Sequence, residues 1–83
     1  MPQQTRVDVL PIQEVVASAS PSAWRDGLVR AQGDAQVTVV LLDGEHRVLT
    51  TRATPRPGEP VAVHPAAGLL AVGGVWYAAR PSV

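Results

Sequence analysis

Short hydrophobic runs separated by turn-forming residues fill most of the chain. From Trp24 onward these runs recur at the roughly 8–12-residue spacing that is typical of all-β domains. The pattern predicts strands over residues 28–32, 36–42, 47–53 and 61–64. Residues 69–79 form either one strand bent at Gly73-Gly74 or two strands joined there by a tight turn. Residues 55–60 contain three prolines, which donate nothing to a sheet, so this segment is predicted to be a loop.

The clearest local signal is a hairpin centred on Asp43-Gly44. The residues before it include a run of four β-branched side chains at 37–40, which favours a strand, and Asp-Gly is a strong hairpin signal. We expect Gly44 to have a positive φ. A two-residue and a four-residue loop both place the same side chains on one face, which we predict to be the core: Val37, Val39, Leu41, Val48 and Thr50. A three-residue loop would break this assignment.

The opposite face of the hairpin is also apolar under this assignment. It would carry Thr38, Val40, Leu42, Arg47, Leu49 and Thr51. Such a surface is too apolar for full solvation, and we expect the N-terminal arm or a partner to cover it.

Together these elements predict a small all-β domain. We expect a five- to six-stranded antiparallel barrel, OB-like or SH3-like, over residues 24–80, with an N-terminal arm over 1–23 and a short tail over 81–83. The arm carries three prolines, and each disfavours helix for the residue before it. We therefore expect an extended arm, although residues 12–17 fit a single helical turn equally well and a partly disordered tail is the plainer alternative.

The arm is unusually apolar for a solvated tail, which makes it a candidate protein interface. An extended arm would leave the barrel and contact another chain, and the alternating residues 5–10 suit strand addition to a neighbour. Trp76 and Tyr77 are adjacent in a predicted strand, so one should face the core and the other a rim or interface. The predicted interface residues are Val7, Val9, Leu10, Ile12, Val15, Val16, Trp24, Trp76 and Tyr77.

Composition and charge narrow the class of protein further. The chain has 83 residues, no net charge and no cysteine, and all its basic residues are arginine. Disulfides and thiolate metal sites are thereby excluded. The bias towards Ala, Val, Gly, Pro and Arg indicates a high-GC bacterial or phage genome. A barrel of this size is marginally stable alone, so oligomerisation or docking in an assembly is expected.

No constellation of residues predicts catalysis or cofactor binding. His46 and His64 lack partners at metal-ligand spacing, and Asp43 and Glu45 are explained by a solvated hairpin turn. The serines fall in the two tails and not in a nucleophile elbow. We expect no enzyme, no bound metal and no cofactor.

A basic strip offers an alternative function. Arg30, Arg47, Arg52 and Arg56 would suit single-stranded nucleic acid if aromatic residues lay between them, but the three aromatic residues flank the barrel. Zero net charge also argues against a general nucleic-acid binder. A small accessory or regulatory barrel domain that binds a ligand between loops is a third alternative.

Targeting signals are not expected. The start of the chain lacks the pattern of a signal peptide, and the longest apolar stretch, residues 68–79, is shorter than the roughly 20 residues that span a bilayer. We expect a soluble protein that is made in the cytoplasm.

Three segments carry a resemblance to a known family. The strand ending in Leu-Asp-Gly at residues 37–44, the loop entering Val-Ala-Val at 58–63 and the Gly-flanked strand at 68–73 resemble small OB-fold proteins of tailed bacteriophages, found in tails and baseplates. One extra leucine precedes Asp43, which a β-bulge would absorb. The pattern is also similar to small barrel domains of transporter ATPases.

The phage resemblance implies a role and a location. It implies a structural protein in the tail, baseplate or head–tail region of a virion, made in the host cytoplasm and without an active site. Its partners would be other virion proteins and copies of itself, with neither membrane nor nucleic acid involved.

Overall fold

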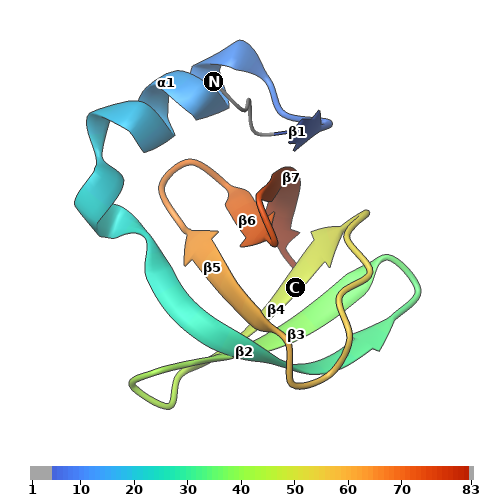
Figure 1. Cartoon of the computed structure of the whole chain (residues 1–83). Coiled ribbons are helices and arrows are strands. Elements are labelled where there is room, and N and C mark those ends of the chain that lie inside the picture. Colours follow the sequence, from blue (N-terminus) through green and yellow to red (C-terminus); the bar gives the residue numbers. More distant parts are fainter. Residues whose placement is uncertain (1–4, 83) are drawn as a thin grey trace.

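A closed antiparallel barrel forms the body of the computed structural model, which describes residues 5–82 (Figure 1). Each barrel strand pairs with two neighbours, in the order β2-β3-β4-β7-β6-β5 and back to β2. The expected all-β barrel is therefore confirmed, with six strands among the described residues. Their bounds are β2 (Arg25–Gly33), β3 (Gln36–Leu41), β4 (His46–Thr51), β5 (Pro60–His64), β6 (Leu69–Val72) and β7 (Val75–Pro81).

The first four barrel strands follow a Greek-key path. Hairpins join β2 to β3 and β3 to β4, and the chain then returns through residues 52–59 to place β5 beside β2. Residues 55–59 of this proline-rich connection form a loop, as expected, whereas Pro60, which was predicted to be in the loop, is the first residue of β5. The loop is nevertheless fixed to β2, because the Val29 N–H donates to the Glu59 carbonyl and the Gly58 N–H donates to the Val29 carbonyl.

The β3–β4 hairpin turns at Asp43-Gly44, and Gly44 has the expected positive φ of 90°. The loop has three residues, however, because the Leu41 N–H donates to the Glu45 carbonyl and the Gly44 N–H donates to the Leu41 carbonyl. This length shifts the register by one residue and reverses the predicted faces of β4. Val37 lies opposite Leu49, so Leu49 and Thr51 face the interior, and the predicted Val48 and Thr50 do not.

Residues 69–79 form two strands, which resolves the alternative that the sequence left open. Gly73 and Gly74 join β6 to β7 with φ values of 54° and 85°, a combination that a two-residue primed turn requires. Val72, the last residue of β6, pairs with Val75, the first residue of β7, and this pair closes the hairpin. Glycine is needed here because side chains at both central positions of this turn would be strained.

The barrel interior is filled by small and branched aliphatic side chains from its strands and from the connection after β4. Alternation along each strand places every second residue inside. Val37, Val39 and Leu70 are completely buried, and Tyr77 is partly buried and packs against the same cluster. The buried members are Val29, Val37, Val39, Leu41, Leu49, Ala53, Val61, Val63, Leu70 and Ala79.

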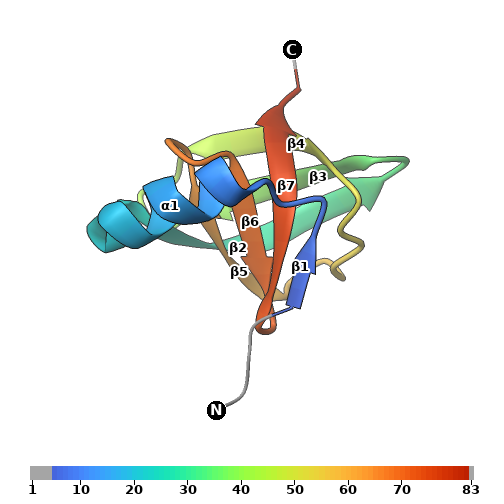
Figure 2. The ribbon, with the colours of Figure 1, turned by 90° about the horizontal axis from the view of Figure 1, so that it is seen from above.

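The N-terminal segment differs from the extended arm that the prolines predicted. It folds back onto its own barrel as a short strand β1 (Thr5–Val7), a helix α1 (Pro11–Ala19) and a 3₁₀ turn η1 (Pro21–Ala23). Strand β1 runs parallel to β7, and Figure 2 shows α1 crossing above β6 and β7. Residues 1–4 of the expected arm and residue 83 of the expected tail lie outside the described residues.

Helix α1 begins at Pro11, although the prolines of this segment were expected to disfavour a helix. Pro11 is the first helical residue, where its missing N–H costs nothing and its fixed φ is already helical. The Gln13 side chain accepts a hydrogen bond from the Leu10 N–H at 2.8 Å and so closes the first turn. Within residues 5–82, no helix is long and apolar enough to cross a membrane.

Candidate interaction surfaces

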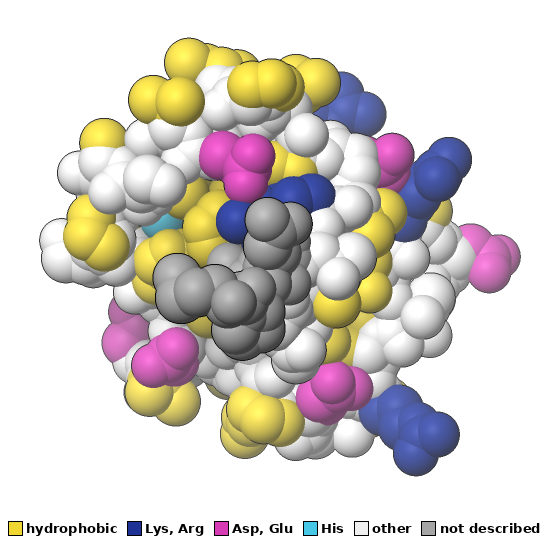
Figure 3. Space-filling model, turned by 45° about the horizontal axis from the view of Figure 1, so that its top comes forward, with side chains coloured by type: hydrophobic (Ala, Val, Ile, Leu, Met, Phe, Trp, Pro, Cys, Tyr) yellow, Lys and Arg dark blue, Asp and Glu magenta, His cyan; other side chains and the backbone are white. Residues whose placement is uncertain are grey.

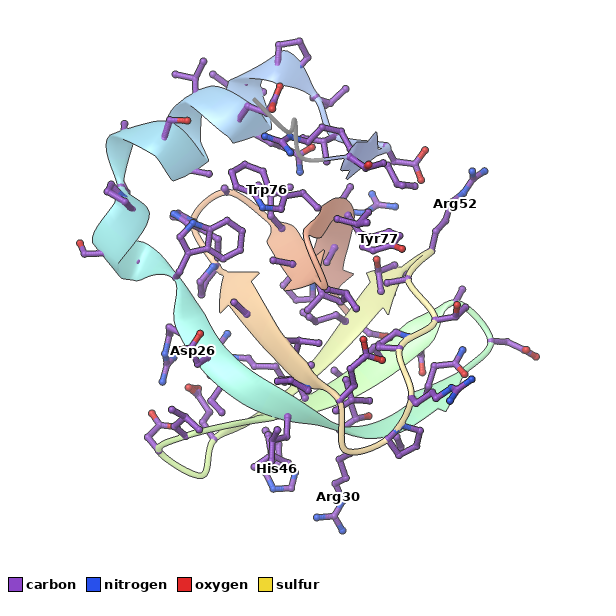
Figure 4. The ribbon with its side chains drawn as sticks, viewed as in Figure 1. Asp26, Arg30, His46, Arg52, Trp76 and Tyr77 are labelled. Atoms are coloured by element: carbon purple, nitrogen blue, oxygen red, sulfur yellow. The ribbon has the colours of Figure 1, made fainter. Side chains whose placement is uncertain are left out.

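A second apolar cluster lies outside the barrel, between α1 and the strands β6 and β7. Ala17, Ala67 and Leu69 are buried there. Around them pack four of the nine predicted interface residues, which are therefore used inside the molecule: Val9, Val16, Trp24 and Trp76. Trp76 and Tyr77 face opposite sides of β7, as predicted, with Trp76 under α1 and Tyr77 against the barrel core (Figure 4).

Charged and aromatic contacts hold β1 to this cluster. The Arg6 guanidinium lies 3.9 Å from the centre of the Trp76 ring and pairs with Glu14 of α1. A cation over a tryptophan face is attracted by the ring's electron-rich surface. Arg6 thus joins β1, α1 and β7, and Val7, another predicted interface residue, lies in β1 opposite Tyr77.

Two polar side chains fix the helix to the turn between β5 and β6. The Gln13 amide donates to the carbonyls of Ala67 and Gly68, each at 3.1 Å. Buried His64 accepts from the Ala67 N–H at its Nδ1 (3.1 Å), and its Nε2 lies 2.8 Å from the Ser20 carbonyl. These contacts assign the Nε2–H tautomer, in which both ring nitrogens are satisfied.

Sequence reasoning missed the roles of both side chains. His64 was expected only to lack partners at metal-ligand spacing; it is 0% exposed and meets the Trp24 ring edge-on at 5.1 Å between ring centres. No signal near either residue in the sequence indicates these distant contacts. His46, by contrast, is exposed at the start of β4, as predicted.

The outward face of α1 carries the exposed part of the predicted interface. Leu10, Ile12 and Val15 are 61%, 62% and 62% exposed, and together they form what we call the α1 stripe. Figure 3 shows hydrophobic side chains along the upper edge of the molecule, where α1 lies. Large exposed aliphatic side chains that adjoin one another mark interaction sites more often than isolated ones do.

A second exposed apolar surface lies on the outside of β2, β3 and β4. Its main members are Leu28, Leu42 and Val48, which are 49%, 78% and 41% exposed. Leu28 lies opposite Val40, which in turn lies opposite His46, so the surface continues across the three strands. We call it the sheet surface. Residues 5–23 do not cover it, contrary to one expectation, because they pack over β6 and β7 instead.

The four arginines of the predicted basic strip do not form a strip. Arg47 pairs with Glu45 at 3.2 Å, and Arg52 pairs with Asp8 at 3.2 Å. Arg30 lies at the bulge in β2, and Figure 4 shows Arg30 and Arg52 at opposite ends of the molecule. Arg56 is exposed in the connection before β5. Two of the four arginines are thus engaged by carboxylates, and Arg30 and Arg52 do not lie side by side.

The tip of the β3–β4 hairpin holds a network of charged side chains. Arg25 of β2 pairs with Asp43 and, at 2.9 Å, with Glu45. The pKa of Asp43 is lowered, chiefly because the Glu45 N–H donates to its Oδ1 at 2.9 Å and further because Arg25 lies beside it. The pKa of Arg25 is raised, chiefly by its hydrogen bond to Glu45. Both carboxylates are thus engaged by a structural ion pair.

Of the residues named for chemistry, Asp43 and Glu45 lie together at the hairpin tip, whereas the two histidines lie apart. Within residues 5–82 no group of three or more His, Asp or Glu side chains is placed to hold a metal ion. His46 begins β4, while His64 is enclosed beneath η1.

Comparison of the chain with protein-family models, with curated proteins and with solved structures finds no match in any of the three.

Proposed function

We propose that this chain is a non-enzymatic structural protein of a phage virion, in the tail, baseplate or head–tail region, that acts through protein–protein contacts. The observation that carries the contact function is the α1 stripe. The virion assignment comes from the resemblance of residues 37–44, 58–63 and 68–73 to small phage OB-fold proteins.

The α1 stripe is poorly explained by the stability of the helix alone. Ile12 and Val15 are β-branched and favour helix less than Glu, Lys or Ala, which would also be better solvated. Other residues of the same segment, Val9, Val16 and Ala17, already supply the apolar contacts that dock it on the barrel. A partner that covers the outward face would account for aliphatic residues there.

Barrel closure restricts how such a partner can bind. Every strand of the closed barrel has both edges paired, so strand addition is limited to the outer edge of three-residue β1. The sequence predicted that a free arm adds a strand to a neighbour. In its place we infer that the chain binds its partner through side chains on its exposed surfaces. This mode suits a small protein that adds to an assembly without unfolding.

The test uses the phage whose genome encodes this chain. Purified particles should contain the chain in a fixed stoichiometry, and its absence from particles would overturn the virion assignment. In a complementation assay, Ile12→Ser with Val15→Ser should fold but fail to enter particles. The matched control, Ile12→Leu with Val15→Leu, keeps the surface apolar and should enter. Equal incorporation of both variants would overturn the role of the α1 stripe.

A further inference from the structure

A crevice lies next to the α1 stripe, between the N-terminal segment and the outside of β4 and β7. Its volume of about 450 Å³ is in the range of small-ligand sites. Leu10 lines it from one side, and Thr50, Ala78 and Arg80 line it from the strands. Leu10 therefore belongs to both features, so the crevice and the α1 stripe form one continuous surface.

The crevice has a positive charge that the described residues do not balance. Arg52 is paired with Asp8, whereas the guanidinium of Arg80 makes no ion pair or hydrogen bond to another residue in the range 5–82. Arg80 lies directly opposite Thr50 in the β4–β7 ladder. A guanidinium on a partly apolar wall favours a carboxylate, which it can bind through two parallel hydrogen bonds.

The sheet surface has the complementary composition. Asp26 precedes Gly27 in β2, and Gly27 is buried, so alternation places Asp26 and Leu28 together on the outside of the barrel. Asp26 is exposed and has no side-chain partner among the described residues. Leu28 and Leu42 provide the exposed apolar area beside it.

We propose that these two surfaces bind each other in different copies of the chain. The α1 stripe of one copy packs on the sheet surface of a second, and Arg80 at the crevice pairs with Asp26 of that second copy. A helix packed on the outside of a sheet is one of the standard layered arrangements of proteins, and here the sheet surface has no such cover. The contact rests on the proposed assembly function and specifies its partner.

The contact is head-to-tail, because the two surfaces lie on different sides of one molecule. Figure 4 shows Asp26 on β2 and Arg52, at the crevice rim, on opposite sides of the barrel. A contact of this kind repeats from copy to copy and gives a ring if the rotation closes, or a filament if it does not. Both products are consistent with stacked or annular assemblies.

Sedimentation velocity of the purified chain over a range of concentrations tests the contact. The wild type should self-associate, and Arg80→Glu or Asp26→Arg alone should weaken association about tenfold to a hundredfold, as expected for a charged hydrogen-bonded pair. The double variant, Arg80→Glu with Asp26→Arg, should restore association. As a control, Arg56→Glu changes the net charge by the same amount as Arg80→Glu, but at an unrelated exposed site, and should associate like the wild type.

The outcomes separate this inference from the function on which it rests. A wild type that stays monomeric, or single variants that associate as well as wild type, would overturn the contact. Failure of the double variant to recover, with circular dichroism and melting unchanged, would overturn the Arg80–Asp26 pairing. A monomeric chain that still enters particles would overturn the contact but not the virion function. Self-association of a chain that is absent from particles would support the contact but overturn the virion function.

Discussion

Replacing Gln13 by methionine should loosen the N-terminal segment from the barrel and also remove one hydrogen bond in the first turn of α1. Gln13 is the polar link between α1 and the β5–β6 turn, through hydrogen bonds to the carbonyls of Ala67 and Gly68. Methionine has a similar length and a similar helix propensity but no amide. Gln13→Met therefore removes the hydrogen bonds while it keeps the shape of the side chain and the helix.

The expected loss follows from the bonds that disappear. Two hydrogen bonds from the amide nitrogen and one to its oxygen, from the Leu10 N–H, are lost. Each is worth about 1 kcal/mol net. The site is only partly buried, so water satisfies some of the freed carbonyls, and the free energy of unfolding should fall by about 1–2 kcal/mol. That corresponds to a decrease in melting temperature of about 4–16 °C for a domain of this size.

Urea denaturation followed by tryptophan fluorescence measures this directly, because Trp24 and Trp76 both lie in the cluster under α1. Gln32→Met is the matched control: the Gln32 amide bonds only the carbonyl of the next residue, and its loss should change stability by less than about 0.5 kcal/mol. Equal stability of the two variants would refute the view that Gln13 fixes α1 to the barrel.

Three further substitutions test the barrel by thermal or urea denaturation. Gly27→Ala should destabilise by about 1–3 kcal/mol, since its Cβ would lie 2.6 Å from the Val40 carbonyl oxygen; a neutral result would mean that β2 and β3 separate easily. Ala35→Gly should stabilise by about 0.5 kcal/mol, because Ala35 has a φ of 58° that costs about 1–2 kcal/mol in a non-glycine residue; a loss of stability would contradict this. The pKa of Asp43 is lower in the folded state than its ordinary value near 3.8. The ionised Asp43 carboxylate therefore stabilises the fold at pH values above 3.8, and this contribution is lost as the pH falls through the folded pKa. Wild type should therefore exceed Asp43→Asn in melting temperature near neutral pH, with the gap closing in acid, and a pH-independent gap would argue against the shift.

The strands were predictable because their signals are local. The β-branched run at 37–40 and the Asp43-Gly44 turn act within a few residues and lie where expected, and the paired glycines at 73–74 form one of the two alternatives that the sequence left open. The faces of β4 were not predictable in the same way. Alternation has a period of two, so one additional residue in the loop, Leu42, was enough to exchange inside for outside.

The N-terminal helix and the second cluster depended on distant contacts. Pro11 was taken as a helix breaker, although at the first helical position it favours the helix. Nothing near Gln13 or His64 in the sequence indicates that they meet residues far along the chain. The predicted interface was therefore divided by tertiary structure, and only Leu10, Ile12 and Val15 remain as a large exposed apolar surface of α1.

The parallel pairing of β1 with β7 has a consequence for the order of events during synthesis. β1 is the first described strand to be made and β7 is the last, so the site that β1 occupies does not exist until β7 has been made. The Greek-key strands β2 to β5 can pair earlier, but the barrel closes only when β7 joins β4 and β6. Val7, Val9 and the α1 residues consequently remain uncovered on the nascent chain until β6 and β7 have been made.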